Sequence, residues 1–132
     1  MGYVDLHLHT TASDGVKSPS EIVRYAKSKG LQAISITDHD TIGGLEEGLA
    51  EGDRIGLEVI PGIEISAVHS PGSMHLLGYF IDIHHPPLSE RLKYLQRARE
   101  ERNPRMVEKL NWLGVKGVLC HVLFSRRISV IA

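Results

Sequence analysis

The sequence has a single cysteine, Cys120, among its 132 residues. One thiol cannot form an internal disulfide framework, and this scarcity predicts a protein of the reducing cytoplasm. The sequence also has no cationic leader followed by an apolar signal core, and no apolar run that approaches about 18 residues. We therefore expect neither secretion nor a membrane span.

An excess of charge of one sign is lacking as well. The chain has 15 Lys and Arg against 16 Asp and Glu, which gives a formal net charge of −1. With no overall field to attract duplex nucleic acid or an anionic membrane, we expect stable binding to neither, so an anionic ligand has to be held by local groups. The sequence shows no internal repeat or linker, and its length predicts one domain, shorter than the roughly 200 residues of a closed α/β barrel.

Histidine, by contrast, is abundant, with eight residues. The first two lie in VDLHLHTTASDG (4–15), which begins as a predicted strand. Because side chains of a strand alternate between its faces, His7 and His9 share one face with Asp5. Burial of an imidazole contributes little to the stability of the fold unless the ring binds a ligand. The opposite, apolar face, which we expect to pack against the core, consists of Val4, Leu6 and Leu8.

Strands and helices alternate in the rest of the chain. Ser18, Pro19 and Glu21 are typical of a helix start, and Gly30 of its end. Three further strands are predicted at 31–37, 57–66 (interrupted by Pro61 and Gly62) and 74–82, with a weaker helix at 41–56. A long helix is predicted from Ser89 to Gly114, with a kink or a break into two helices near Asn103 because of Pro104, and a final apolar, β-prone stretch follows at 115–132. This order predicts a mostly parallel α/β sheet.

Six polar residues lie near the ends of these predicted strands. Ligands bind at the carboxyl ends of parallel strands in open α/β sheets and in barrels. Five of the six fall at such ends, whereas His75 stands at the start of its strand, on the wrong side for a parallel sheet. The candidate site residues are His7, His9, Asp14, His39, Glu64 and His75.

The candidates supply imidazole and carboxylate but no thiolate. This donor set suits manganese, iron or zinc, with a position left open for water. Glu64 is the best placed carboxylate to bridge two ions. A metal-bound water that loses its proton near neutral pH attacks phosphorus, so the predicted chemistry is metal-assisted hydrolysis of phosphoesters.

Four segments, DLHLHTTASDG, ITDHDTIGG, PGIEIS and HLLGYFID, carry a resemblance in sequence and order. Over about residues 3–113 the chain resembles the amino-terminal half of the PHP (polymerase and histidinol phosphatase) family. It is most similar to the small nucleotide phosphoesterases and RNA-trimming exonucleases, because the polymerase branch tends to have TDHG in place of TDHD. The resemblance implies a distorted β/α barrel with up to three divalent ions (Mn, Fe or Zn): one held by His7, His9 and Glu64, one by Glu64 and His75, and one by Asp14 and His39.

The family completes its site with a further histidine and an Asp-x-His pair from the second half of the barrel. We therefore expect a single, partial PHP domain over 1–132, a truncated barrel in which 115–132 diverges. The proposed substrate is a phosphate-ester small molecule or a short oligonucleotide. Three alternatives stay open: a working or impaired phosphoesterase, a metal-binding remnant or regulatory module without turnover, and a structural fragment that needs a partner chain.

Two further expectations follow from the same segments. Unpaired strand edges and the apolar tail predict a homo-oligomer. Asp38 and Asp40 flank His39, and each either orients an imidazole or caps the following helix.

Overall fold

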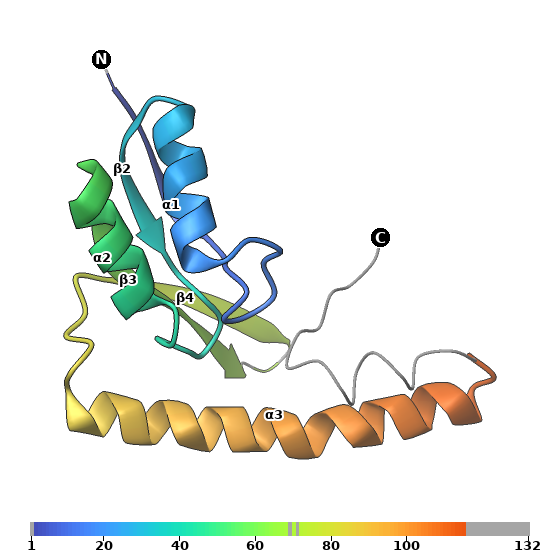
Figure 1. Ribbon diagram of the computed structural model, residues 1–132. Helices are drawn as coiled ribbons and strands as arrows, with labels where there is room; N and C mark the ends of the chain where they lie inside the picture. The colour runs from blue at the N-terminus through green and yellow to red at the C-terminus, as the bar shows by residue number, and fades with distance from the viewer. Residues whose placement is uncertain (1, 69, 71, 116–132) are drawn as a thin grey trace.

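Four strands form one sheet in the part of the chain that the computed structural model describes, residues 2–68, 70 and 72–115 (Figure 1). The first three strands are parallel, and the fourth is antiparallel to the third. The mostly parallel α/β arrangement is the predicted one. In sheet order the strands are β1 (Tyr3–Leu8), β2 (Leu31–Ile36), β3 (Glu58–Val68) and β4 (Ser73–Tyr79).

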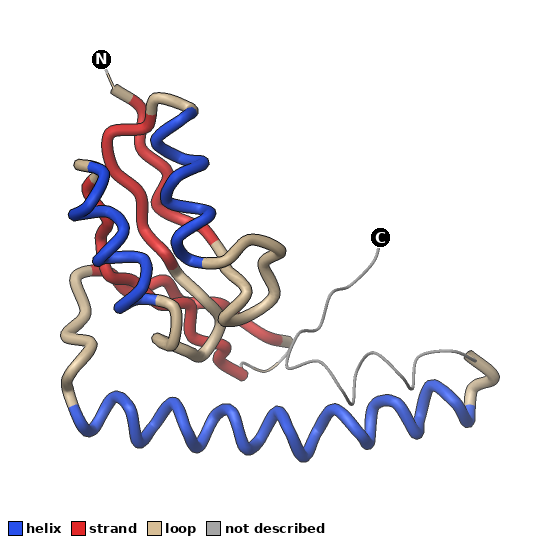
Figure 2. The backbone as a smooth tube through the Cα atoms, viewed as in Figure 1, coloured by secondary structure: helices blue, strands red, loops and turns tan. Residues whose placement is uncertain are grey.

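Two helices, α1 (Pro19–Ser28) and α2 (Leu45–Ile55), lie side by side on one face of this sheet (Figure 2). The predicted start of α1 is confirmed: Ser18 Oγ accepts a hydrogen bond from the backbone N–H of Glu21, and the Glu21 carboxylate accepts one from the N–H of Ser18. The main core lies between the helices and the sheet. Its buried members are Val23, Ala26, Ile34, Ile36, Leu45 and Leu57.

The apolar face of β1 differs from its prediction. Leu8 packs against the core, but Val4 is 56% exposed and Leu6 is 37% exposed, so the expectation that all three are packed is wrong. The reason is the position of β1 at the sheet edge, since α1 packs on β2 and α2 packs on β3.

Strand β3 continues through Pro61 and Gly62, where the sequence predicts an interruption. The strand changes partner at this point. Pro61 is paired with Ile36 of β2, and Gly62 is the first residue paired with β4. A Cβ on Gly62 would collide with the side chains of Ser35 and Thr37, so glycine leaves the room that these side chains of the neighbouring segment occupy. The uninterrupted strand carries Glu64 to the carboxyl end of the sheet.

A long helix, α3 (Pro86–Trp112), crosses the end of the sheet toward which β2 points (Figure 1). The helix is continuous through Asn103, so the expectation of a break into two helices is wrong, and the helix begins before Ser89. Two prolines are tolerated in its first turn, where their missing N–H groups have no partner in the helix. Pro104 removes one hydrogen bond inside the helix, and the good helix formers on both sides keep the rest.

The contacts of α3 are few and partly polar. Only Leu92 and Val107 are buried among its residues, whereas Met106 and Leu113 are more than half exposed. Gln96 Nε2 donates to the carbonyl of Asp40 at 3.1 Å, and Arg99 forms an ion pair with the Asp40 carboxylate at 2.6 Å. These bonds fix α3 against the loop that follows β2.

The last predicted strand falls in 115–132, of which 116–132 lie outside the described residues. Within the described ranges, no helix combines the length and the apolar character needed to cross a membrane.

Candidate metal centre

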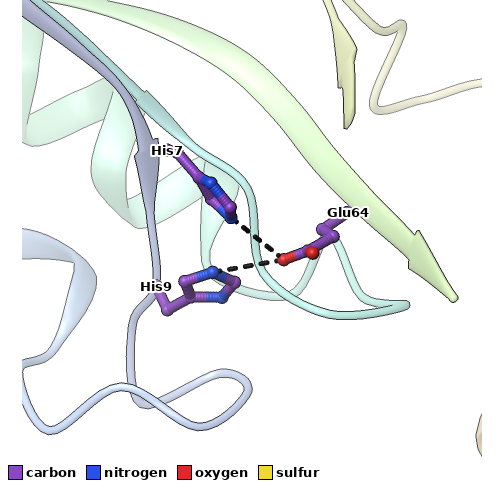
Figure 3. A group of neighbouring side chains, drawn as sticks. All are labelled: His7, His9 and Glu64. Carbon is purple, nitrogen blue, oxygen red and sulfur yellow. Dashed lines mark hydrogen bonds and ion pairs between the residues drawn. The ribbon is translucent and has the colours of Figure 1, made fainter. Parts of the chain in front are cut away.

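Glu64 lies at the centre of a ring of imidazoles. Its carboxylate is nearly fully buried, with the residue 3% exposed. Glu64 Oε2 lies 3.1 Å from His7 Nε2, 3.2 Å from His9 Nε2 and 3.3 Å from His39 Nδ1. The other oxygen, Oε1, lies 2.7 Å from His75 Nδ1. Figure 3 shows the rings of His7 and His9 pointing from β1 and the residue beyond it toward Glu64 on β3.

Asp14 provides a second carboxylate on the other side of two of these rings. Its oxygens lie 3.4 Å from His9 Nδ1 and 3.6 Å from His39 Nε2. His9 and His39 therefore each direct one ring nitrogen toward Glu64 and the other toward Asp14. The rings stack with centroids 4.7 Å apart. All six residues singled out in the sequence thus meet in one cluster.

His75 reaches the cluster because β4 is antiparallel to β3. The start of an antiparallel strand lies beside the end of its neighbour, and His75 is paired with Ser66, two residues beyond Glu64. The expectation that His75 stands at the opposite edge is wrong, since it assumed a parallel strand. The short connection between the two strands, unlike the helical crossovers before it, is the signal for the antiparallel pairing.

The electrostatics of the cluster favour the ionised form of Glu64 and the neutral form of His39, as the directions of their pKa values show. Burial alone would raise the pKa of Glu64, but the hydrogen bond from His7 and the field of the surrounding imidazoles together hold it below its usual value. Burial lowers the pKa of His39, and the carboxylates of Glu64 and Asp14 only partly oppose this effect. Ionised carboxylate and neutral imidazole are the forms that bind metal ions.

Two buried ring nitrogens, Nδ1 of His9 and Nδ1 of His39, lie near the carboxylates of Asp14 and Glu64 but form no hydrogen bond with them or with another group of the described residues. Unsatisfied buried polar atoms are costly, and a cation would satisfy these. The donor atoms fall into groups of three that lie within 4.8 Å of one another. The residues therefore fit divalent ions, and the groups are His7, His9 and Glu64; His9, Asp14 and His39; and His39, Glu64 and His75.

The two aspartates beside His39 act on the backbone. Asp38 accepts hydrogen bonds from Thr10 and Ser13, whereas Asp40 accepts from the N–H of Ser66 at 2.8 Å and pairs with Arg99. The residue before α2 is Gly44, and no side chain caps the start of this helix. Neither aspartate bonds directly to an imidazole within the described residues, and neither caps α2, so the expectation of a helix cap is wrong.

Sequence reasoning missed Arg99, which also donates to Ser66 Oγ at 2.6 Å. It stands among many basic residues of α3, so nothing in the sequence distinguishes it. His84 and His85 are exposed, directly precede α3 and belong to none of the groups of candidate metal ligands found among the described residues. His121 lies outside the described residues.

A tight loop places Asp14. The carbonyl of Thr10 accepts from the N–H groups of Ser13 at 3.0 Å and of Gly15 at 2.9 Å. A Cβ on Gly15 would collide with the carbonyl of His9 and lie 2.7 Å from Thr10 N. We expect Gly15→Ala to shift the loop and to weaken Mn²⁺ binding by about tenfold or more, the size typical of lost support around metal ligands.

Titration of the metal-free chain with Mn²⁺, followed by the electron paramagnetic resonance signal of the free ion, measures this effect. Gly43→Ala is the matched control, because its Cβ would meet only Thr41 Oγ1, at 3.3 Å. Equal Mn²⁺ affinity in the Gly15→Ala and Gly43→Ala variants would contradict the prediction.

Comparison with known proteins identifies similar chains. A family model described as the PHP domain matches residues 5–113. A 5′-3′ exoribonuclease of Haemophilus influenzae is 38% identical over 111 residues, which cover 84% of this chain and 40% of the relative. A 3′,5′-nucleoside bisphosphate phosphatase of Chromobacterium violaceum is 34% identical over 117 residues, 89% of this chain and 41% of the relative.

Solved structures agree with the fold. One solved structure is described as an amidohydrolase from Chromobacterium violaceum, with bound sulfate and no metal. Its TM-score is 0.82 at 34% identity, and the matched region covers 86% of this chain and 40% of the solved chain. A second structure is described as a metal-dependent phosphoesterase from Bifidobacterium adolescentis. Its TM-score is 0.76 at 32% identity, and the matched region covers 91% of this chain and 46% of the solved chain. The chain thus spans less than half the length of these two relatives and of these two solved structures.

Proposed function

The chain belongs to the PHP domain family, and from this premise we propose that it is a metal-dependent phosphoesterase acting on nucleotides or short oligonucleotides. The observation that carries the proposal is the buried Glu64 carboxylate among four imidazoles, with Asp14 on the far side of two of them. Relatives named as an exoribonuclease and as a nucleoside bisphosphate phosphatase support the substrate class.

The proposed ligands are His7, His9, Asp14, His39, Glu64 and His75, holding manganese, iron or zinc. Bound divalent ions would supply a water of lowered pKa as nucleophile and neutralise the phosphoryl oxygens. The chain's own part is to hold the donor atoms in place. Glu64 keeps its charge despite burial, because the surrounding imidazoles stabilise the carboxylate. His39 stays neutral and so keeps a lone pair for an ion.

A second function has one observation in its favour. The chain spans 40% of the exoribonuclease and 41% of the phosphatase that it matches. The catalytic activity of these longer proteins therefore does not by itself establish that this chain hydrolyses a substrate. In this alternative the chain binds ions without hydrolysing a substrate, as a regulatory or structural module of a larger assembly.

One experiment separates the two functions. The chain is stripped of metal with a chelator, reloaded with Mn²⁺, and assayed on a nucleoside 3′,5′-bisphosphate and on a short 5′-phosphorylated oligoribonucleotide, with bound ions counted in the same sample. We expect phosphate or nucleotide release that needs added Mn²⁺. Bound ions without release support the metal-binding module, and a sample that binds no ions contradicts both functions.

We also expect the chain to self-associate. Both edge strands of the sheet expose apolar side chains, among them Val4 (56% exposed) on β1 and Leu76 (50% exposed) on β4. Such edges are normally paired, covered or charged. Light scattering at micromolar concentration should show a dimer or larger species, and Leu76→Lys should shift it toward monomer. A monomeric unaltered chain would contradict the expectation.

A further inference from the structure

Asp38 is one of the most deeply buried side chains in the described residues, at 1% exposure. Both of its carboxylate oxygens bond to one loop. Oδ1 accepts from the N–H of Thr10 at 2.7 Å and from Ser13 Oγ at 2.5 Å, and Oδ2 accepts from Thr10 Oγ1 at 2.7 Å. A buried carboxylate without such donors is very unfavourable, so these bonds hold Asp38 and the loop together strongly.

The chain neighbours of these residues belong to one group of metal-ligand candidates. Thr10 follows His9, Ser13 precedes Asp14, and Asp38 itself precedes His39. The candidates His9, Asp14 and His39 form one of the groups whose donor atoms lie within 4.8 Å of one another. We propose that Asp38 is a positioning residue that sets the mutual distances of these three ligands, and this proposal rests on the proposed function.

The backbone of Asp38 extends the same effect to β3. Its carbonyl accepts the N–H of Glu64 at 3.2 Å, so Asp38 links the segments that follow β1 and β2 to the strand that carries the central carboxylate. Every bond of its side chain goes to Thr10 or Ser13. Asp38 therefore acts through its neighbours and touches no donor atom of the cluster.

The proposal predicts a specific effect of Asp38→Asn. Asparagine has the same size, but it carries no charge, and its NH₂ group would face Thr10 Oγ1, which then has to accept a hydrogen bond in place of donating one. The charge-assisted bonds that hold the loop become weaker, so Asp14 is held less firmly. We expect Mn²⁺ affinity to fall by about tenfold or more, or one fewer ion to bind, in a chain that still folds.

The experiment titrates the metal-free chain with Mn²⁺ in the absence of substrate, well below the unfolding temperature of each variant. Asp53→Asn, an exposed aspartate in α2, is the matched control. A purely structural role would lower the unfolding temperature and leave the Mn²⁺ isotherm of the folded chain unchanged. Folded Asp38→Asn with the isotherm of the unaltered chain overturns the proposal.

A milder variant tests the positioning role of Asp38 if Asp38→Asn does not fold. Ser13→Ala removes one donor and leaves Asp38 its two bonds to Thr10, and here we expect a loss of Mn²⁺ affinity of about two- to fivefold, smaller than for a complete loss of support. An unchanged isotherm in this variant overturns the proposal. If the unaltered chain binds no Mn²⁺, the metal centre itself is overturned, whereas normal binding with unaffected variants removes only the role of Asp38.

Discussion

Glu64→Gln is expected to abolish both Mn²⁺ binding and Mn²⁺-dependent hydrolysis. The carboxylate oxygens of Glu64 lie 2.7 to 3.3 Å from nitrogens of four histidines. An amide offers one oxygen and no negative charge, so it cannot serve two ions as a carboxylate does. Loss of an outer partner of a ligand costs about 10- to 100-fold in metal affinity, and loss of this shared carboxylate should cost at least the upper value.

Metal content after dialysis and turnover of a nucleoside bisphosphate measure the two effects on one sample. Glu58→Gln is the matched control, because Glu58 lies on the same strand and is exposed. Circular dichroism checks that both variants fold. Retained metal stoichiometry in folded Glu64→Gln would show that Glu64 has only a structural role.

The part of the site that could be predicted from the sequence depends on local rules. The two-residue period of a strand places His7 and His9 on one face, and the common edge of parallel strands brings Glu64 and His39 toward them. Both rules need only the identity of the elements, which strong local signals such as the Ser18 capping box provide. The convergence of these residues was therefore predictable without tertiary contacts.

The part of the site that could not be predicted depends on contacts between segments distant in the sequence. His75 lies in the site only because β4 is antiparallel to β3. Asp38 bonds to Thr10 and Ser13 only because their loop folds over its carboxylate. Nor does sequence periodicity show which face of β1 is covered, since that depends on where α1 and α2 pack. Tertiary contacts override local patterns at these points.

The PHP resemblance supplied the grouping of ligands, and the distances refine it. His39 joins Glu64 and His75 in one group of three, and His9 joins Asp14 and His39 in another. Each shared imidazole belongs to two groups, through a different nitrogen in each. A single substitution at His9, His39 or Glu64 is therefore expected to disturb more than one ion.

Replacing His7 and His9 together by alanine is expected to remove the tightest metal site. Their Nε2 atoms lie 3.1 and 3.2 Å from Glu64 Oε2, so one group of three loses two donors and keeps only the carboxylate. A chelate reduced to one ligand no longer competes with water. Since His9 also belongs to the group with Asp14 and His39, that group is weakened too.

Only the group of His39, Glu64 and His75 keeps all of its donors in the double variant. Elemental analysis should therefore find at most one ion per chain, and hydrolysis should fall below detection. His84→Ala combined with His85→Ala is the matched control, because it removes an exposed pair of histidines outside the cluster. The side chain of His7 is 49% exposed and that of His9 24%, so the fold should survive their loss. Unchanged metal content in the folded double variant would mean that the two imidazoles meet at Glu64 without holding an ion.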